Sequence, residues 1–112
     1  MSAHEIDALQ HPHIVAFHKF FSEYHIFFKV GQDRFRLSIR VYETDDHRYC
    51  FEQSHFIETP VQQSANPDTH ERHNRPEAAL SRAVESVTTY YEDAVGKGHV
   101  PNASWFVPNN VY

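Results

Sequence analysis

Residues 34–42 read Arg34-Phe35-Arg36-Leu37-Ser38-Ile39-Arg40-Val41-Tyr42, a strict alternation of polar and apolar side chains. Successive side chains of an extended strand point to opposite faces of a sheet. The four apolar side chains of this segment therefore share one face, and the arginines, the serine and the tyrosine share the other. The pattern predicts a half-buried strand whose outer face is a row of guanidinium groups.

The segments on either side of this strand also favour strands. From Tyr24 onward the sequence alternates with a period of two, and Gly31-Gln32-Asp33 is a turn that joins the two strands as a hairpin. A second turn is expected at Thr44-Asp45-Asp46, followed by a third strand over Arg48 to Phe56. The sequence thus predicts a three-stranded antiparallel meander.

The region before the meander favours short N-terminal helices. Ser2 and Glu5 have the spacing of a capping box, and Pro12 suits the first turn of a second helix. Apolar residues then recur at helical spacing, at Ile14, Phe17, Phe20 and Phe21. We therefore expect two short helices ahead of the first strand.

The most strongly periodic segment lies after the meander. Pro76 and Glu77 are typical of a helix start, with Asn74 or Arg75 as the N-cap, and glycines at positions 96 and 98 are typical of a helix end. Apolar side chains form one stripe at i, i+3 and i+4 spacing: Ala79, Leu80, Ala83, Val84, Val87, Tyr91, Ala94 and Val95. This predicts one long C-terminal helix packed on the sheet.

Two segments lack such periodicity. Residues 59–74 are polar and offer little to a core. Loops of this length without secondary structure are uncommon in compact domains and are usually either functional or disordered, and we expect a disordered loop here. Residues 99–112 place Trp105 and Phe106 between two prolines, which predicts an extended aromatic tail, either an edge strand or a segment wrapped around the sheet. The predicted fold is a single α+β domain over residues 1–112.

Composition limits the classes of protein this chain can belong to. With 112 residues, 40% of them hydrophobic, the chain supports one modest core. No run is long and apolar enough for a membrane helix, the N-terminus lacks the pattern of a secretion signal, and Cys50 has no second cysteine with which to form an internal disulfide. We therefore expect a cytoplasmic protein that does not bind membranes.

Three kinds of chemical site find little support in the sequence. Ten histidines suggest metal binding, but the pairs His11–His13 and His70–His73 lack a four-ligand framework. Cys50 and His55 are five positions apart on one predicted strand, so a regular pleat sends them to opposite faces. Three glycines in the whole chain leave no phosphate-binding loop. We expect no metal, no cofactor and no catalytic residues.

The outer face of the arginine strand is the best candidate for a working surface. Guanidinium groups bind carboxylates and phosphates through two parallel hydrogen bonds. In a simple hairpin register, one aromatic side chain of the first strand points the same way. The candidate partner-binding face is therefore Arg34, Arg36, Arg40, Tyr42 and Phe27.

The aromatic content predicts self-association. Aromatic residues make up 14% of the chain, and a three-stranded sheet has only one face for the long helix to cover. Small domains that cannot cover such area alone commonly form two-fold dimers. We expect a homodimer.

The long helix resembles part of a known family. The segment from Pro76 through Tyr90-Tyr91-Glu92 to Gly98 and Pro101 is similar to the helix and exit of HicB-type antitoxins, which place such a helix after a small sheet and bind a toxin partner. The strands depart from that family, so we transfer no functional residues. The predicted element order also resembles double-stranded-RNA-binding domains, but the lysines that those domains carry at the start of this helix are missing.

We expect a non-catalytic interaction protein that binds another macromolecule. Compact acidic chains without catalytic motifs are frequent among phage and mobile-element accessory proteins. A net charge of −5 makes a protein partner a better expectation than a nucleic acid. Two alternatives remain open, a nucleic-acid binder that uses the arginine face and a small-ligand binder or enzyme with a His/Tyr-lined pocket between helix and sheet.

Overall fold

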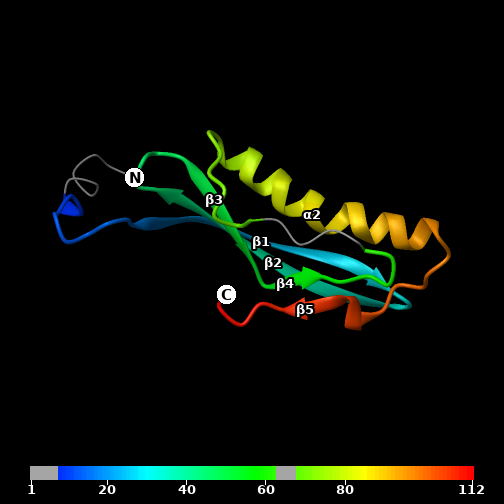
Figure 1. Cartoon of the computed structure of the whole chain (residues 1–112). Coiled ribbons are helices and arrows are strands. Elements are labelled where there is room, and N and C mark those ends of the chain that lie inside the picture. The colour runs from blue at the N-terminus through cyan, green and yellow to red at the C-terminus, as the bar shows by residue number, and fades with distance from the viewer. Residues whose placement is uncertain (1–7, 63–67) are drawn as a thin grey trace.

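The computed structural model describes residues 8–62 and 68–112. The molecule is elongated, with principal extents of 53 × 26 × 24 Å. It is an α+β fold: one long helix lies over an antiparallel sheet, and a second, smaller sheet lies beside it (Figure 1). The described elements are β1 (His18–Val30), β2 (Asp33–Thr44), β3 (Tyr49–Gln53), β4 (His55–Ile57), α2 (Pro76–Gly96), the 3-10 helix η1 (Ala103–Trp105) and β5 (Phe106–Pro108).

The predicted three-stranded meander is confirmed. β1 and β2 form a long hairpin whose closing pair is Val30 and Asp33, joined through Gly31 with a φ of 63°. A positive φ is readily adopted by glycine, which explains the residue at this turn. β3 continues the sheet antiparallel to β2, in the order β1-β2-β3.

The second predicted N-terminal helix is wrong. β1 begins at His18, so Phe20 and Phe21 lie in a strand, and Phe20 pairs with Tyr42 of β2. A short run of aromatic residues fits either period, and pairing with a strand distant in the sequence decides between them. The first predicted helix falls largely on residues 1–7, which lie outside the described residues.

The third predicted strand divides into two elements. At Ser54 the backbone N–H donates to the Ser38 carbonyl at 2.8 Å, and the Ser54 hydroxyl accepts from the Ser38 N–H at 2.8 Å. A side chain thus replaces a backbone acceptor at this point, and the chain leaves the first sheet as β4. β4 pairs antiparallel with β5, so the aromatic tail forms a two-stranded sheet instead of remaining simply extended.

The long helix begins and ends as its sequence predicts. Arg75 is the N-cap residue, with no side-chain capping bond, and Pro76 opens the first turn. At the other end the N–H of Gly98, whose φ is 88°, donates to the Val95 carbonyl at 3.0 Å. The buried stripe matches the prediction at Ala79, Ala83, Val87 and Ala94, whereas Val95 stays 43% exposed.

The core lies between α2 and the apolar face of the first sheet, and the tail closes one end of it. Trp105 and Phe106 are 5% and 4% exposed. The Phe106 ring stacks on Phe35 with centroids 4.4 Å apart, and Tyr91 of α2 meets the Trp105 ring edge-on at 5.9 Å. The tail is therefore an integral part of the core.

The loop over residues 59–74 is described only at its two ends, so the prediction of disorder stays a prediction. Near its end, Tyr49 and His73 exchange two backbone hydrogen bonds of 2.7 Å. Arg72 donates to the Asp45 carboxylate at 2.8 Å and pairs with Asp46 at 2.9 Å. These contacts hold the segment just before α2 against the turn between β2 and β3.

Candidate functional site

The two faces of the meander differ as the alternation predicts. Leu37, Ile39 and Val41 are at most 1% exposed on the face that α2 covers. Arg34 and Arg36 are exposed on the opposite face, which we call the open face. The two-residue period therefore sorts apolar groups inward and guanidinium groups outward.

The C-terminal tail covers the middle of the open face. The Tyr112 hydroxyl donates to the Glu23 carboxylate at 2.8 Å, and Arg40 Nε donates to the same oxygen at 2.9 Å. The Arg40 guanidinium lies 4.0 Å from the centroid of the Tyr112 ring. Arg40 is thus paired with an acid and stacked under an aromatic ring of its own chain.

These contacts change the acidity of the groups involved. The hydrogen bonds from Tyr112 and Arg40 hold the pKa of Glu23 below its ordinary value. Burial and the bond to the Glu23 carboxylate raise the pKa of Tyr112 well above that of a free phenol. Glu23 therefore stays ionised and Tyr112 protonated at neutral pH, which maintains the hydrogen bond between them.

Tyr42 lies beyond the tail on the same face. Its hydroxyl is 3.4 Å from the Glu52 carboxylate, and burial, followed by the charge of Glu52, raises its pKa. The rings of Phe20 and His18 lie 6.2 and 6.3 Å from the Tyr42 ring. Tyr42 belongs to an aromatic cluster separated from the exposed arginines by the tail.

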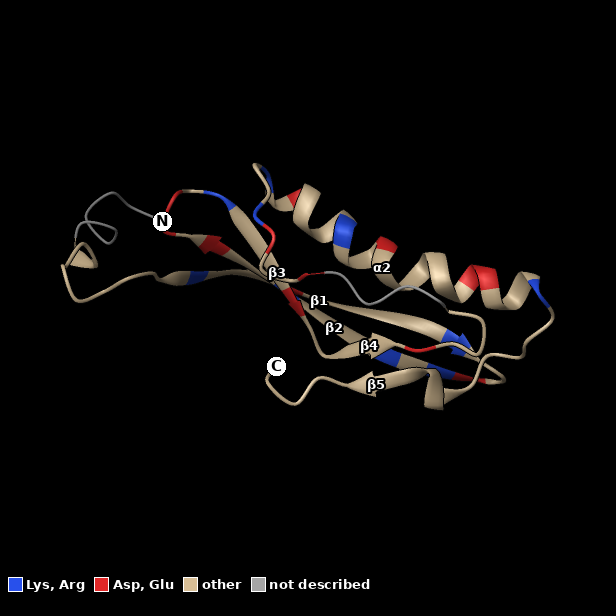
Figure 2. Cartoon of the chain, viewed as in Figure 1, with Lys and Arg blue, Asp and Glu red and all other residues tan. Residues whose placement is uncertain are grey.

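The end of the open face nearest the hairpin turn remains uncovered by described residues. Phe27 is 54% exposed, and the Arg34 guanidinium lies 5.2 Å from the centroid of its ring. Arg36 pairs with Phe27 across the hairpin, and Lys29 pairs with Arg34. Neither arginine forms an ion pair with a described residue, and Figure 2 shows the basic positions along this end of β1 and β2. We call Phe27, Arg34 and Arg36 the basic surface.

The structure thus separates the five residues of the predicted face. Phe27, Arg34 and Arg36 come together and are exposed, whereas Arg40 is engaged by Glu23 and Tyr112 and Tyr42 lies in the aromatic cluster. Sequence reasoning did not find the tail contacts. Tyr112 and Glu23 are 89 positions apart in the sequence. The tail has no periodic pattern from which its contact with β1 could be predicted.

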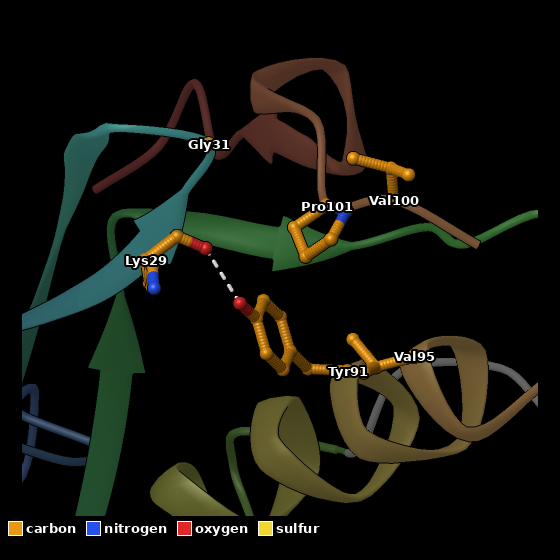
Figure 3. Close-up of a pocket in the computed structure, with 6 residues that line it drawn as sticks. All are labelled: Lys29, Gly31, Tyr91, Val95, Val100 and Pro101. Atoms are coloured by element: carbon orange, nitrogen blue, oxygen red, sulfur yellow. Dashed lines mark hydrogen bonds between the residues drawn. The ribbon is translucent and has the colours of Figure 1, made fainter. Parts of the chain in front are cut away.

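One pocket lies at the hairpin end, between β1 and the exit of α2. It has a volume of about 310 Å³ and is shown in Figure 3. Tyr91 lines this pocket, and its hydroxyl donates to the Lys29 carbonyl at 2.5 Å. The lining residues are mainly apolar, with one tyrosine and no histidine: Lys29, Gly31, Tyr91, Val95, Val100 and Pro101.

The other sites considered from the sequence lie apart from this surface. The rings of His11 and His13 are 5.3 Å apart, but in the described part of the chain no three His, Cys, Asp or Glu side chains gather as metal ligands. Cys50 is 4% exposed, and burial raises the pKa of its thiol, which disfavours the reactive thiolate.

Comparison with known proteins adds no assignment. No protein family, curated protein or solved structure matches this chain. Within residues 8–62 and 68–112, no helix combines the length and apolar character that crossing a bilayer requires.

Proposed function

We propose that this chain is a small non-catalytic interaction protein that acts as a homodimer and binds an acidic protein partner through the basic surface. The observation that carries the proposal is the contrast between the arginines of β2. Arg40 forms an ion pair with Glu23. Arg34 and Arg36 are exposed and form no ion pair with a described residue.

The chemistry of this surface suits carboxylates. A guanidinium binds a carboxylate through two parallel hydrogen bonds, and such charge-assisted bonds are stronger than neutral ones. Phe27 adds exposed apolar area beside the arginines, and aromatic and arginine residues are the types that dominate binding energy at protein interfaces. An accessory role in a phage or mobile element agrees with the size and composition of the chain.

A nucleic-acid binder would use the same residues, because bases stack on aromatic rings and arginines contact phosphates. The net charge of −5 favours the protein partner. A single-stranded RNA oligonucleotide in a salt-dependent gel shift therefore serves as the rival probe. Salt-sensitive RNA binding lost on Arg36→Glu would replace the protein partner with RNA.

Reversing the charge of the basic surface should abolish partner binding. We expect the double variant Arg34→Glu, Arg36→Glu to bind the partner at least about 100-fold more weakly, because two charge-assisted contacts become repulsive. The partner is identified by affinity capture from the source cells with mass spectrometry, and its affinity for each purified variant is then measured by calorimetry.

The matched control carries Arg82→Glu on α2 and Lys97→Glu at its C-cap, which changes the net charge equally away from the basic surface. This control should capture the same acidic protein as the native chain. Equal capture of the partner by all three proteins would contradict the proposal.

A further inference from the structure

Strand β1 has an outer edge that no described strand occupies. It is the first strand in the order β1-β2-β3, and its register with β2 runs from His18 to Val30. The Lys29 carbonyl accepts from Tyr91, so it points away from β2. Because backbone groups alternate in direction along a strand, the N–H and C=O groups of Phe27, His25 and Glu23 also point outward.

Apart from the Lys29 carbonyl, which already accepts from the Tyr91 hydroxyl, these outward groups form no backbone hydrogen bond with a described residue. Unpaired N–H and C=O groups in a row are a template for another strand. The edge also exposes aromatic side chains on both faces of the sheet, unlike the buried apolar residues of β2. The exposed fractions are 53% for Phe20, 48% for Phe21, 38% for Tyr24 and 54% for Phe27.

We propose that β1 pairs antiparallel with β1 of a second copy, across a two-fold axis at Ile26, to form a continuous six-stranded sheet. This inference rests on the homodimer in the proposed function and names its interface. In this register His25 faces the second copy's Phe27, Tyr24 faces its Phe28, and Glu23 faces its Lys29.

Charge favours this register over those centred on Glu23, His25 or Phe27. A two-fold axis at His25 would place Glu23 opposite Phe27 and His25 opposite itself, and an axis at Glu23 would oppose two carboxylates. An axis at Phe27 would place Lys29 opposite His25. Among these registers, only the one centred on Ile26 places Glu23 opposite Lys29 of the second copy. The two-fold axis repeats this favourable cross-strand pair, so the dimer contains it twice.

The pocket at the hairpin end supports the same register independently. Beyond the second copy's Ser22, which faces Val30, β1 has a bulge between Phe20 and Ser22, and its Phe21 lies at this bulge, near the edge beside Gly31. Phe21 meets Tyr49 with ring centroids 5.4 Å apart, so its side chain lies on the face that α2 covers. The pocket in Figure 3 opens between β1 and α2, on that face. In the dimer, the half-exposed Phe21 side chain of each copy would therefore lie near the apolar pocket of the other copy.

A charge swap tests the register. Lys29→Glu and Glu23→Lys should each weaken dimerisation by about 10- to 100-fold, because both cross-strand pairs become like-charged. An equimolar mixture of the two variants restores opposite charges at both positions and should return the dissociation constant to within about threefold of the native value. The readout is sedimentation velocity over a concentration series, with circular dichroism to confirm that each variant is folded.

Arg82→Glu on α2 is the matched control, since it makes the same change of charge away from both the β1 edge and the basic surface and should leave the dimer intact. A native chain that sediments as a 13.1 kDa monomer at high micromolar concentration would overturn the inference. So would a mixture that associates no better than the separate variants. Binding by the basic surface is read from the Arg34 and Arg36 variants, so failure of the register is distinguishable from failure of the partner proposal.

A cross-link tests the register without disturbing Glu23, which also bonds Arg40 and Tyr112. In a Cys50→Ala background, Ile26→Cys should form an intermolecular disulfide rapidly under mild oxidation, because the two Cα atoms would be about 4.5 Å apart. His25→Cys should not, because its two copies would be offset along the strands beyond the roughly 7 Å limit for a disulfide. Rapid cross-linking at 25 with none at 26 would overturn the register.

Discussion

Phe106→Ala should lower the free energy of unfolding by about 3–5 kcal/mol, the cost typical of removing a buried aromatic ring. Phe106 is 4% exposed and stacks on Phe35, and its ring is 5.4 Å from that of Phe28. The substitution therefore leaves a cavity where the tail, the hairpin and α2 meet. The measurement is urea denaturation at one fixed protein concentration, since association would otherwise change the apparent stability.

Phe20→Ala makes the same chemical change on a residue that is 53% exposed, and its cost should be under about 1 kcal/mol. The difference between the two losses in the free energy of unfolding measures how much the packing of the tail contributes to stability. Equal and small losses for both would mean that the tail does not contribute to the core in solution.

Gln53→Glu should remove about 3.5 kcal/mol of stability at pH 7, because burial is expected to raise the folded-state pKa of the new acid by about three units. Gln53 is fully buried; its Oε1 accepts from the Ser86 hydroxyl at 3.3 Å, and its Nε2 has no partner among the described residues. The only described side chain that bonds the Gln53 amide is the uncharged Ser86 hydroxyl, so burial would penalise the charged form of a carboxylate there.

The sign of the pH dependence follows from that shift. The folded state holds the proton more tightly than the unfolded state, whose glutamate has a pKa of about 4.3. The loss should therefore be absent below about pH 4 and grow as the pH rises toward the folded-state pKa. Denaturation of the variant and the native chain at pH 4 and pH 7 measures this.

Gln53→Met is the matched control, because it keeps a similar volume and removes the unpaired amide. Its cost should stay under about 1.5 kcal/mol and should not depend on pH. A loss of stability relative to the native chain that is the same at pH 4 and pH 7 would show that the site admits water and is not part of the core.

The elements predicted correctly are those with a strong local period. The alternation around Leu37 defines the buried face of β2, and the stripe from Ala79 to Ala94 defines the buried face of α2. Gly31 and Gly98 mark a turn and a helix end through their positive φ angles. These features depend on neighbouring residues, so one sequence carries them directly.

The features that were missed depend on contacts between distant residues. The strand at Phe20 is specified by its pairing with Tyr42, and the break at Ser54 by its exchange of hydrogen bonds with Ser38. The loss of Arg40 from the exposed surface follows from Tyr112, at the far end of the chain. Such contacts leave no periodic signal in the segments that make them.

Amide hydrogen exchange shows whether the outer edge of β1 is buried in an interface between two copies. At a protein concentration well above the dissociation constant, the outward amides of Glu23, His25 and Phe27 should exchange as slowly as those of Tyr24 and Ile26, which bond to β2. On dilution to the monomer, only the outward three should lose their protection. Fast exchange at those three amides under conditions where the protein sediments as a dimer would contradict the account.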